Sequence, residues 1–547
     1  ITIGYRPVMA ALKVTFWLAA IAVAVLRPNL ANPAWRRLER AGARFARHPV
    51  ACWLGPGLIV LLVRAALLPL WPAPQPVIYD EFGYLLQADT FAAGRLTNPP
   101  HPLWPFFESV YILQQPTYNA KYPPGQGLVL ALGQRFFGDP WFGVWLSCGA
   151  LMAALCWALQ GWLPGSWALL GGLLALPLCL FSYWMDSYWG GAVAAAGGAL
   201  VLGSYARMVR RCRFAFAWLM GIGLVILALT RMYEGLLFAA PFVVALLVRR
   251  RGFRVWAPIA MVLAAGAAFT FHYNARVTGH ATRFPYTEYQ RQYGYVPSFN
   301  IQPLNPAITY RNLSVANVFF KWEYAQWKRS RSWGLVVDRF REWGMVVTLV
   351  AGGAPLMLVF LGFLWTTAQD RRMFLPLAGL GAVFLGSFLQ IVYNAHYAAP
   401  ATAAVLLLLV QAFRHLRHSR LPAASRGRAL CRAIPAAMLI ALSAAQGVRL
   451  YGQETIEQTK PVNARRAKIE RKLLDQYGGR HLIVVRYTGS QNPHEEWVYN
   501  RADIDASDVV WAHDMGVEED RKLTDYFKGR RVWLFLPDAD PDSLAPY

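Results

Sequence analysis

Twelve apolar segments run through this 547-residue chain and constrain its fold more than any other feature. A helix that crosses about 30 Å of hydrocarbon needs roughly 20 mostly apolar residues. The segments that approach this length lie near residues 8–26, 50–71, 139–160, 166–184, 190–206, 214–230, 235–248, 255–271, 343–365, 373–392, 396–413 and 433–448. Only 15% of the residues are charged, against about 25% in an average soluble protein. The sequence therefore predicts a polytopic α-helical membrane protein with about twelve transmembrane helices.

Arginine clusters in the connections between these segments account for much of the net charge of +24. The clusters lie in residues 27–48, 207–213, 249–254, 371–372 and 414–432. Counting the spans places all of them on one side, and an excess of Arg and Lys in short loops marks the cytoplasmic side. We therefore expect both termini and the long loops 72–138 and 272–342 on the outer side. Nucleic-acid binding would instead need basic residues gathered on a soluble face, so nucleic acid is not an expected partner.

The last hundred residues differ from the rest in being charged and less apolar. Residues 449–477 are typical of a charged helix, and a second helical segment lies near 517–528. Three short strands are predicted at residues 481–485, 508–512 and 530–536. Parallel pairing through the 517–528 crossover would give a small α/β domain, on which a protein partner could dock. Its clustered polar groups, which we expect to be mainly solvated, are His494, Glu495, Glu496 and Asp514.

Three regions follow from these patterns. Residues 1–49 form an N-terminal transmembrane helix and a basic cytoplasmic segment. Residues 50–448 form the main transmembrane domain, and residues 449–547 form the outer, periplasmic α/β domain. The six cysteines show no disulfide framework and no metal-binding spacing. No cofactor is predicted to be required, and a divalent metal is not indicated.

The first outer loop contains the strongest candidates for chemistry. Asp80 and Glu81 follow the end of an apolar segment by about nine residues, and residues 81–95 have the apolar spacing of an amphipathic helix lying on the membrane. The two acids could cap this helix or serve in catalysis, and the motif alone does not choose between these roles. Further along, two prolines and a glycine fix a turn at residues 122–125. Just before it, Lys121 offers a point charge suited to phosphate.

Other polar groups near outer boundaries are candidates for the walls of a substrate cavity. They are Asp186, Tyr188, Arg231, Glu234, His396 and Tyr397. Arg231 and Glu234, three positions apart, could instead form an ion pair with each other, since charge near hydrocarbon must be neutralised. A single histidine such as His396 is more often structural than functional. The basic loop 272–342 could bind lipid phosphates or an acidic glycan, or could simply be a solvated surface.

The order of motifs in the first loop resembles the GT-C superfamily of membrane glycosyltransferases. The resemblance rests on Asp80-Glu81, on Tyr84, on an A-x-x-x-A-x-G-R pattern at 88–95 and on the Tyr-Pro-Pro-Gly turn. It is closest to the branch of protein O-mannosyltransferases and lipid A aminoarabinose transferases. Gly83 stands where some of these proteins have an arginine.

The resemblance implies that Asp80 is the catalytic base or orients the acceptor, with Glu81 in a lesser part. It implies that Lys121 binds the donor phosphate and that Asp186 assists. We take Tyr84, Lys121, Tyr122, Asp186, Tyr188, Arg231, Glu234, His396 and Tyr397 as candidate substrate- or donor-binding residues.

The expected protein is a multi-pass glycosyltransferase of the bacterial inner membrane. It would move a sugar from a polyprenyl-phosphate donor to a glycan, lipid or protein acceptor on the outer face, in contact with membrane lipid. Two alternatives remain: a non-catalytic GT-C-like subunit of a larger complex, and a lipid or solute transporter. Inverted repeats would favour a transporter, and we detect none in the sequence.

Overall fold

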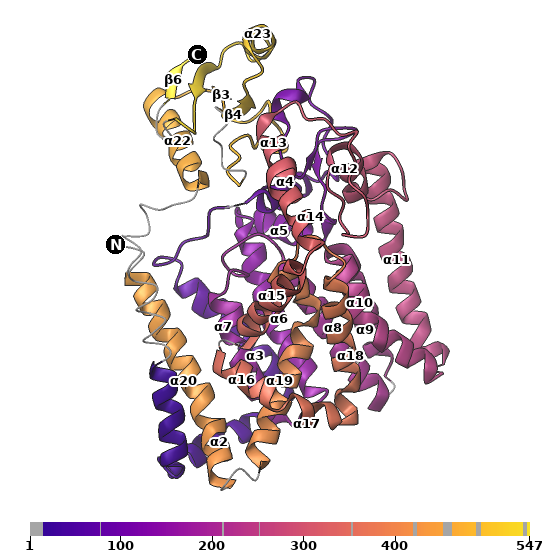
Figure 1. Ribbon diagram of the computed structural model, residues 1–547, viewed down its shortest axis with the longest axis vertical. Coiled ribbons are helices and arrows are strands. Elements are labelled where there is room, and N and C mark those ends of the chain that lie inside the picture. The colour runs from indigo at the N-terminus through magenta and orange to yellow at the C-terminus, as the bar shows by residue number, and fades with distance from the viewer. Residues whose placement is uncertain are drawn as a thin grey trace.

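The computed structural model describes most of the chain. The described residues are 15–76, 78–210, 213–250, 252–351, 354–419, 424–451, 462–487, 494–539 and 544–547. Within them the chain forms a helical bundle, a layer of loops and short helices at one end of it, and an α/β unit beyond that layer (Figure 1). The start of the first apolar segment, Cys212 and residues 452–461 of the charged tail lie outside the described residues.

The helices of the bundle follow the predicted apolar segments. They are the helix Thr15–Leu26, α3 (Pro49–Ala66), α6 (Trp141–Gln160), α7 (Gly165–Phe181), α8 (Gly191–Arg210), α9 (Phe214–Thr230), α10 (Met232–Val248), α11 (Phe253–Thr278), α15 (Gly334–Ala351), α16 (Ala354–Gly362), α18 (Phe374–Ser387), α19 (Thr402–His418) and α20 (Ala424–Tyr451). Among the described residues, five helices are long and apolar enough to cross a membrane: Pro49–Ala66, Trp141–Gln160, Gly191–Arg210, Phe253–Thr278 and Ala395–His418. The predicted helical membrane class agrees with this architecture, whereas the count of twelve spans stays a prediction.

Small residues allow the bundle helices to approach closely, as is usual in membrane proteins. Gly198 of α8 faces the short helix η4 (Ala395–Ala401). A Cβ at this position would lie 1.9 Å from the carbonyl oxygen of Pro400, which only a glycine avoids. This contact fixes η4, which contains His396 and Tyr397, against the centre of the bundle.

The two ends of the bundle differ in charge. The basic segments lie at the end marked by α2 (Asn32–Phe45), α17 (Leu364–Gln369) and η3 (Arg371–Met373), opposite the α/β unit (Figure 1). Glu39 of α2 accepts hydrogen bonds from Arg417 at 3.1 Å and from Arg432 at 3.0 Å, which ties α2 to α19 and α20. The arrangement agrees with clustering of the basic loops on one side. Which side of a membrane this end faces stays a prediction.

The loop layer is built from the two long loops that the sequence predicts. Its elements are α4 (Tyr79–Ala92), η1 (Trp104–Phe107), β1 (Ile112–Leu113), β2 (Asn119–Ala120), α5 (Pro124–Phe137), α12 (Pro285–Tyr293), α13 (Leu313–Asn317), η2 (Val318–Glu323) and α14 (Tyr324–Ser330). The predicted helix after Asp80 is present as α4, but it does not lie on a membrane surface with one face open. Its buried residues occur on several faces, because other parts of the protein cover it.

The C-terminal unit has the predicted α/β character. Its elements are α22 (Val462–Tyr477), β3 (His481–Val485), β4 (Val509–His513), α23 (Val517–Tyr526), β5 (Arg531–Phe535) and β6 (Leu544–Pro546). The sheet order is β4-β3-β5-β6. Strand β3 pairs in parallel with both β4 and β5, so the crossover through α23 passes β3 rather than joining neighbouring strands. The antiparallel strand β6 was not predicted.

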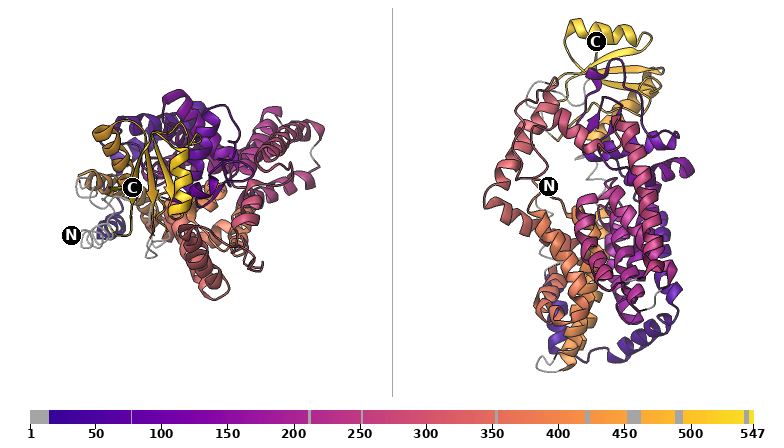
Figure 2. Two further views of the ribbon diagram at one scale, coloured as in Figure 1. Left: turned by 90° about the horizontal axis from the view of Figure 1, so that it is seen from above. Right: turned by 90° about the vertical axis from the view of Figure 1, so that its right-hand side faces the viewer.

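The C-terminal unit packs directly on the loop layer (Figures 1 and 2). The backbone N–H of Ala502 donates to Asp89 of α4 at 2.8 Å, and the ring of Tyr499 stacks on Phe82 with centroids 3.9 Å apart. Our expectation that Glu496 is solvated was wrong. Its side chain is buried. The carboxylate accepts hydrogen bonds from the hydroxyl of Tyr487 at 2.5 Å and from two backbone N–H groups, which replace the hydration that burial removes.

Candidate active site

Glu81 caps helix α4, which is one of the two roles that the sequence left open for the acids. The helix begins after Ile78, and the Glu81 carboxylate accepts a hydrogen bond from the backbone N–H of Ile78 at 3.2 Å. Its other oxygen accepts from the backbone N–H of Tyr188 at 3.0 Å. The Glu81 side chain is buried. These contacts satisfy the orphan N–H group at the helix start and hold the 182–190 turn against α4.

Because Glu81 supplies the cap, Asp80 is available for a different contact. The hydroxyl of Tyr122 donates to Asp80 Oδ1 at 2.6 Å, and the Tyr122 ring stacks on Tyr84 with centroids 4.5 Å apart. Gly83 makes room for this ring, since a Cβ there would lie 2.9 Å from Tyr122 Cε2. The glycine that departs from the family pattern therefore has a local reason: it lets Tyr122 reach Asp80.

Lys121 lies in a cage of tyrosine rings. Its Nζ is 3.2 Å from the ring centroid of Tyr111, 4.9 Å from that of Tyr286, 5.2 Å from that of Tyr289 and 5.5 Å from that of Tyr122. Burial lowers the pKa of Lys121 to about 8, against the opposing effects of Glu323 and Asp80. No carboxylate among the described residues lies within 4 Å of it, and the wall formed by Tyr286 is 39% exposed. The amine is thus desolvated, interacts with the charge of Asp80 and lies beside a partly exposed tyrosine ring.

A second carboxylate, Glu323, belongs to this cluster and was missed by the sequence analysis. It ends the π-helical turn η2 and accepts a hydrogen bond from the hydroxyl of Tyr111 at 3.1 Å. Burial raises its pKa to about 7, with Lys121 acting in the opposite direction. Tyr111 and Glu323 are 212 positions apart. No local spacing could have linked them.

Arg231, between α9 and α10, adds a second cation. Its guanidinium carbon lies 4.2 Å from the ring centroid of Tyr397, and its charge interacts with those of Asp80 and Glu234. The carboxylate of Glu234, however, accepts a hydrogen bond from Gln390 Nε2 at 2.8 Å. The described contacts of Arg231 and Glu234 thus go to different groups. Whether Arg231 lines a substrate cavity stays a prediction.

The other predicted residues make contacts typical of a scaffold. Asp186 lies 3.6 Å from Arg64, which is fully buried. The Tyr188 hydroxyl donates to the carbonyl oxygen of Pro74 at 3.0 Å. His396 is buried, with its ring centroid 4.7 Å from that of Trp189. The structure therefore brings together Asp80, Tyr84, Lys121, Tyr122, Arg231 and Tyr397, and it places Asp186, Tyr188 and His396 around them in packing contacts.

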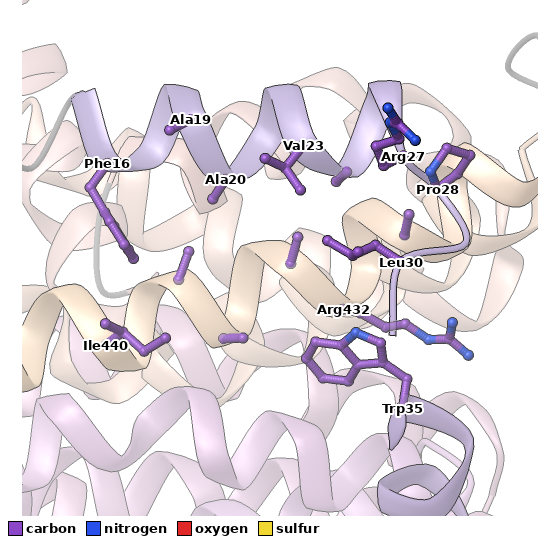
Figure 3. Close-up of a pocket in the computed structure, with 15 residues that line it drawn as sticks. Phe16, Ala19, Ala20, Val23, Arg27, Pro28, Leu30, Trp35, Arg432 and Ile440 are labelled. Carbon is purple, nitrogen blue, oxygen red and sulfur yellow. The ribbon is translucent and has the colours of Figure 1, made fainter. Parts of the chain in front are cut away.

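Two cavities lie away from Asp80. The larger, of about 380 Å³, is an apolar groove between the helix Thr15–Leu26 and α20, with Arg27 and Arg432 at one end (Figure 3). The smaller, of about 170 Å³, is lined by polar residues of α14, α15 and the 391–394 segment. Within the described residues, no group of three His, Cys, Asp or Glu side chains is placed to hold a metal ion.

No protein-family model and no curated protein sequence matches the chain. Solved structures do match. The crystal structure of ArnT from Cupriavidus metallidurans bound to undecaprenyl phosphate superposes with a TM-score of 0.51 at 15% sequence identity, over 89% of this chain and 92% of that one. The apo structure of the same protein gives a TM-score of 0.47 at 15% identity, over 88% and 93%. The predicted resemblance is thereby confirmed at the level of fold: this chain has the fold of ArnT.

Proposed function

We propose that this protein is a glycosyltransferase that moves a sugar from a polyprenyl-phosphate donor to an acceptor on the outer face of the bacterial inner membrane. The observation that carries this proposal is the grouping of one carboxylate, Asp80, with two cations, Lys121 and Arg231, that face aromatic rings. The proposal is supported by the fold shared with ArnT, a protein that was crystallised with undecaprenyl phosphate.

The roles follow from the chemistry of the transfer. The bond between the sugar C1 and the donor phosphate oxygen breaks, and its electron pair stays on the phosphate. The acceptor oxygen forms the new bond to C1, and its proton passes to Asp80, which acts as general base. Lys121 and Arg231 stabilise the charge that develops on the leaving phosphate. Glu81 has the supporting role of holding α4 and the 182–190 turn in place.

The surroundings of this site agree with a lipid-linked donor. The site lies at the end of the apolar bundle, where a polyprenyl chain could stay among the helices while its phosphate reaches Lys121. The basic end of the bundle would face the cytoplasm, so the site and the C-terminal unit would be periplasmic. We propose that the C-terminal unit covers α4 and offers a surface to a glycan, lipid or protein acceptor.

The test is sugar transfer by purified protein in lipid nanodiscs, with Asp80→Asn compared with wild type. Asparagine still accepts the hydrogen bond from Tyr122 but cannot take up a proton. Because a positioned general base contributes about 10²–10⁴-fold, transfer should fall by that factor with unchanged thermal stability.

Glu81→Gln is the matched control, since it alters the neighbouring carboxylate in the same helical turn. It should lower stability more than Asp80→Asn and lower transfer less. Transfer that survives in Asp80→Asn, or an absence of transfer in wild type with any polyprenyl-phosphate sugar, would contradict the proposal and favour a non-catalytic subunit.

A further inference from the structure

Tyr111 connects the two charged groups at the deepest part of the site. Its ring face receives the ammonium of Lys121, with Nζ 3.2 Å from the centroid. Its hydroxyl donates to Glu323 Oε1 at 3.1 Å. Lys121 thus contacts the ring face of Tyr111 and Glu323 contacts its hydroxyl. Lys121 and Glu323 do not form an ion pair within 4 Å. Glu323 is held in this position by the π-helical turn η2, a local irregularity often found at functional sites.

Glu323 lies among a lysine, a second carboxylate and four tyrosines. The titratable groups facing it are Lys121, Asp80, Tyr111, Tyr286, Tyr289 and Tyr310. Burial raises the pKa of each of these tyrosines above its usual value, so they stay protonated. Glu323 itself has a pKa of about 7, raised by burial and by Asp80 and opposed by Lys121.

A transferred sugar leaves more negative charge in the site than the donor brought in. The phosphate of a polyprenyl-phosphate sugar is a diester with one negative charge, whereas the product is a monoester whose second ionisation occurs near pH 6. Lys121 is the cation whose charge opposes the raised pKa of Glu323, whereas Arg231 lies against Tyr397. A second anion beside Lys121 weakens the stabilisation that Lys121 gives to an ionised Glu323, and so favours uptake of a proton by Glu323.

We propose that Glu323 takes up one proton from solvent when a phosphate monoester binds beside Lys121, and releases it when that lipid leaves. The proton converts the carboxylate to a carboxylic acid, and no other bond forms or breaks. Lys121 is then free to pair with the phosphate alone. This makes Glu323 a positioning residue that acts through Lys121. The inference rests on the proposed function, because it assumes that Lys121 meets a lipid phosphate.

The experiment is infrared difference spectroscopy on the full chain in nanodiscs, recorded before and after addition of undecaprenyl phosphate. Spectra are recorded at a series of pH values across neutrality, and the comparison is made where wild type without lipid shows no band from a protonated carboxyl group. Wild type should show a new band from a protonated carboxyl group together with the bands of bound phosphate. Glu323→Gln should bind the lipid and lack the carboxyl band, whereas Asp80→Asn should keep it.

Tyr111→Phe is a second variant that tests whether the carboxyl band comes from Glu323. It keeps the ring face for Lys121 but removes the hydroxyl that bonds to Glu323, so the carboxyl band should remain and change frequency. Bound phosphate without a carboxyl band in wild type, or a band that persists in Glu323→Gln, would overturn this inference alone. No bound phosphate in wild type at any pH would overturn the proposed function and this inference together.

Discussion

Two charged clusters lie on either side of the first turn of α4, and they treat their charges in opposite ways. In the scaffold cluster, Glu81 accepts from two backbone N–H groups and Asp186 lies 3.6 Å from Arg64. In the site cluster, Lys121 and Arg231 face aromatic rings. A cation–π contact is worth about 0.5–2 kcal/mol, too little to offset full burial of a cation. Arg64 of the scaffold cluster also faces two rings, those of Trp71 and Trp141, but it has an ion pair with Asp186 as well. We therefore expect the site cluster, unlike the scaffold cluster, to receive an anion from a ligand.

Removing the cation of the scaffold cluster should give the largest effect on stability. Arg64→Met removes the ion pair with Asp186 and also the hydrogen bond that Arg64 donates to the Trp71 carbonyl oxygen at 2.7 Å. Breaking a buried ion pair costs about 3–5 kcal/mol. Thermal unfolding in detergent should show a large fall in midpoint, and a midpoint equal to that of wild type would break the distinction between the clusters.

Removing Lys121, one of the two cations of the site cluster, should lower the affinity for lipid phosphate rather than the stability. Lys121→Met loses a charge-assisted contact to phosphate worth about 1.5–3 kcal/mol, or about 10- to 150-fold in affinity. Stability should not fall, because Lys121 has no described ion-pair partner within 4 Å and its burial disfavours the charge. Titration with undecaprenyl phosphate in nanodiscs measures the affinity. Unchanged affinity would assign Lys121 to packing.

A smaller effect is expected from a substitution that shifts the Tyr122 ring relative to Asp80. Gly83→Ala places a Cβ 2.9 Å from Tyr122 Cε2 and should shift the ring that holds Asp80. A displacement of part of an ångström at a catalytic group should lower the rate of transfer about tenfold. The matched control is Gly344→Ala in α15, where a Cβ meets nothing within 4 Å. Equal rates in the two variants would show that Tyr122 does not position Asp80.

The sequence predicted the helices and strands better than it predicted which side chains contact one another. Apolar spacing located α4, and short apolar runs located β3, β4 and β5 to within about one residue, because these patterns are local. The sequence pointed to capping by the two acids but did not show which one caps, because the N-cap position holds Ile78 rather than a Ser or Thr that would fix the start of the helix. Glu323 was hidden because only the folded loops bring it to Tyr111. Arg64 was hidden within an apolar segment, where its partner Asp186 belongs to a different turn.

The contact between Ala502 and Asp89 has a consequence for how the protein is made. The two residues are 413 positions apart, and the bundle helices from α6 to α20 lie between them in the chain. Helix α4 therefore emerges from the ribosome long before the segment that covers it. This end of the bundle is completed only when the last part of the chain has been made, so synthesis itself delays assembly of the loop layer with its cover until the helices of the bundle have been made.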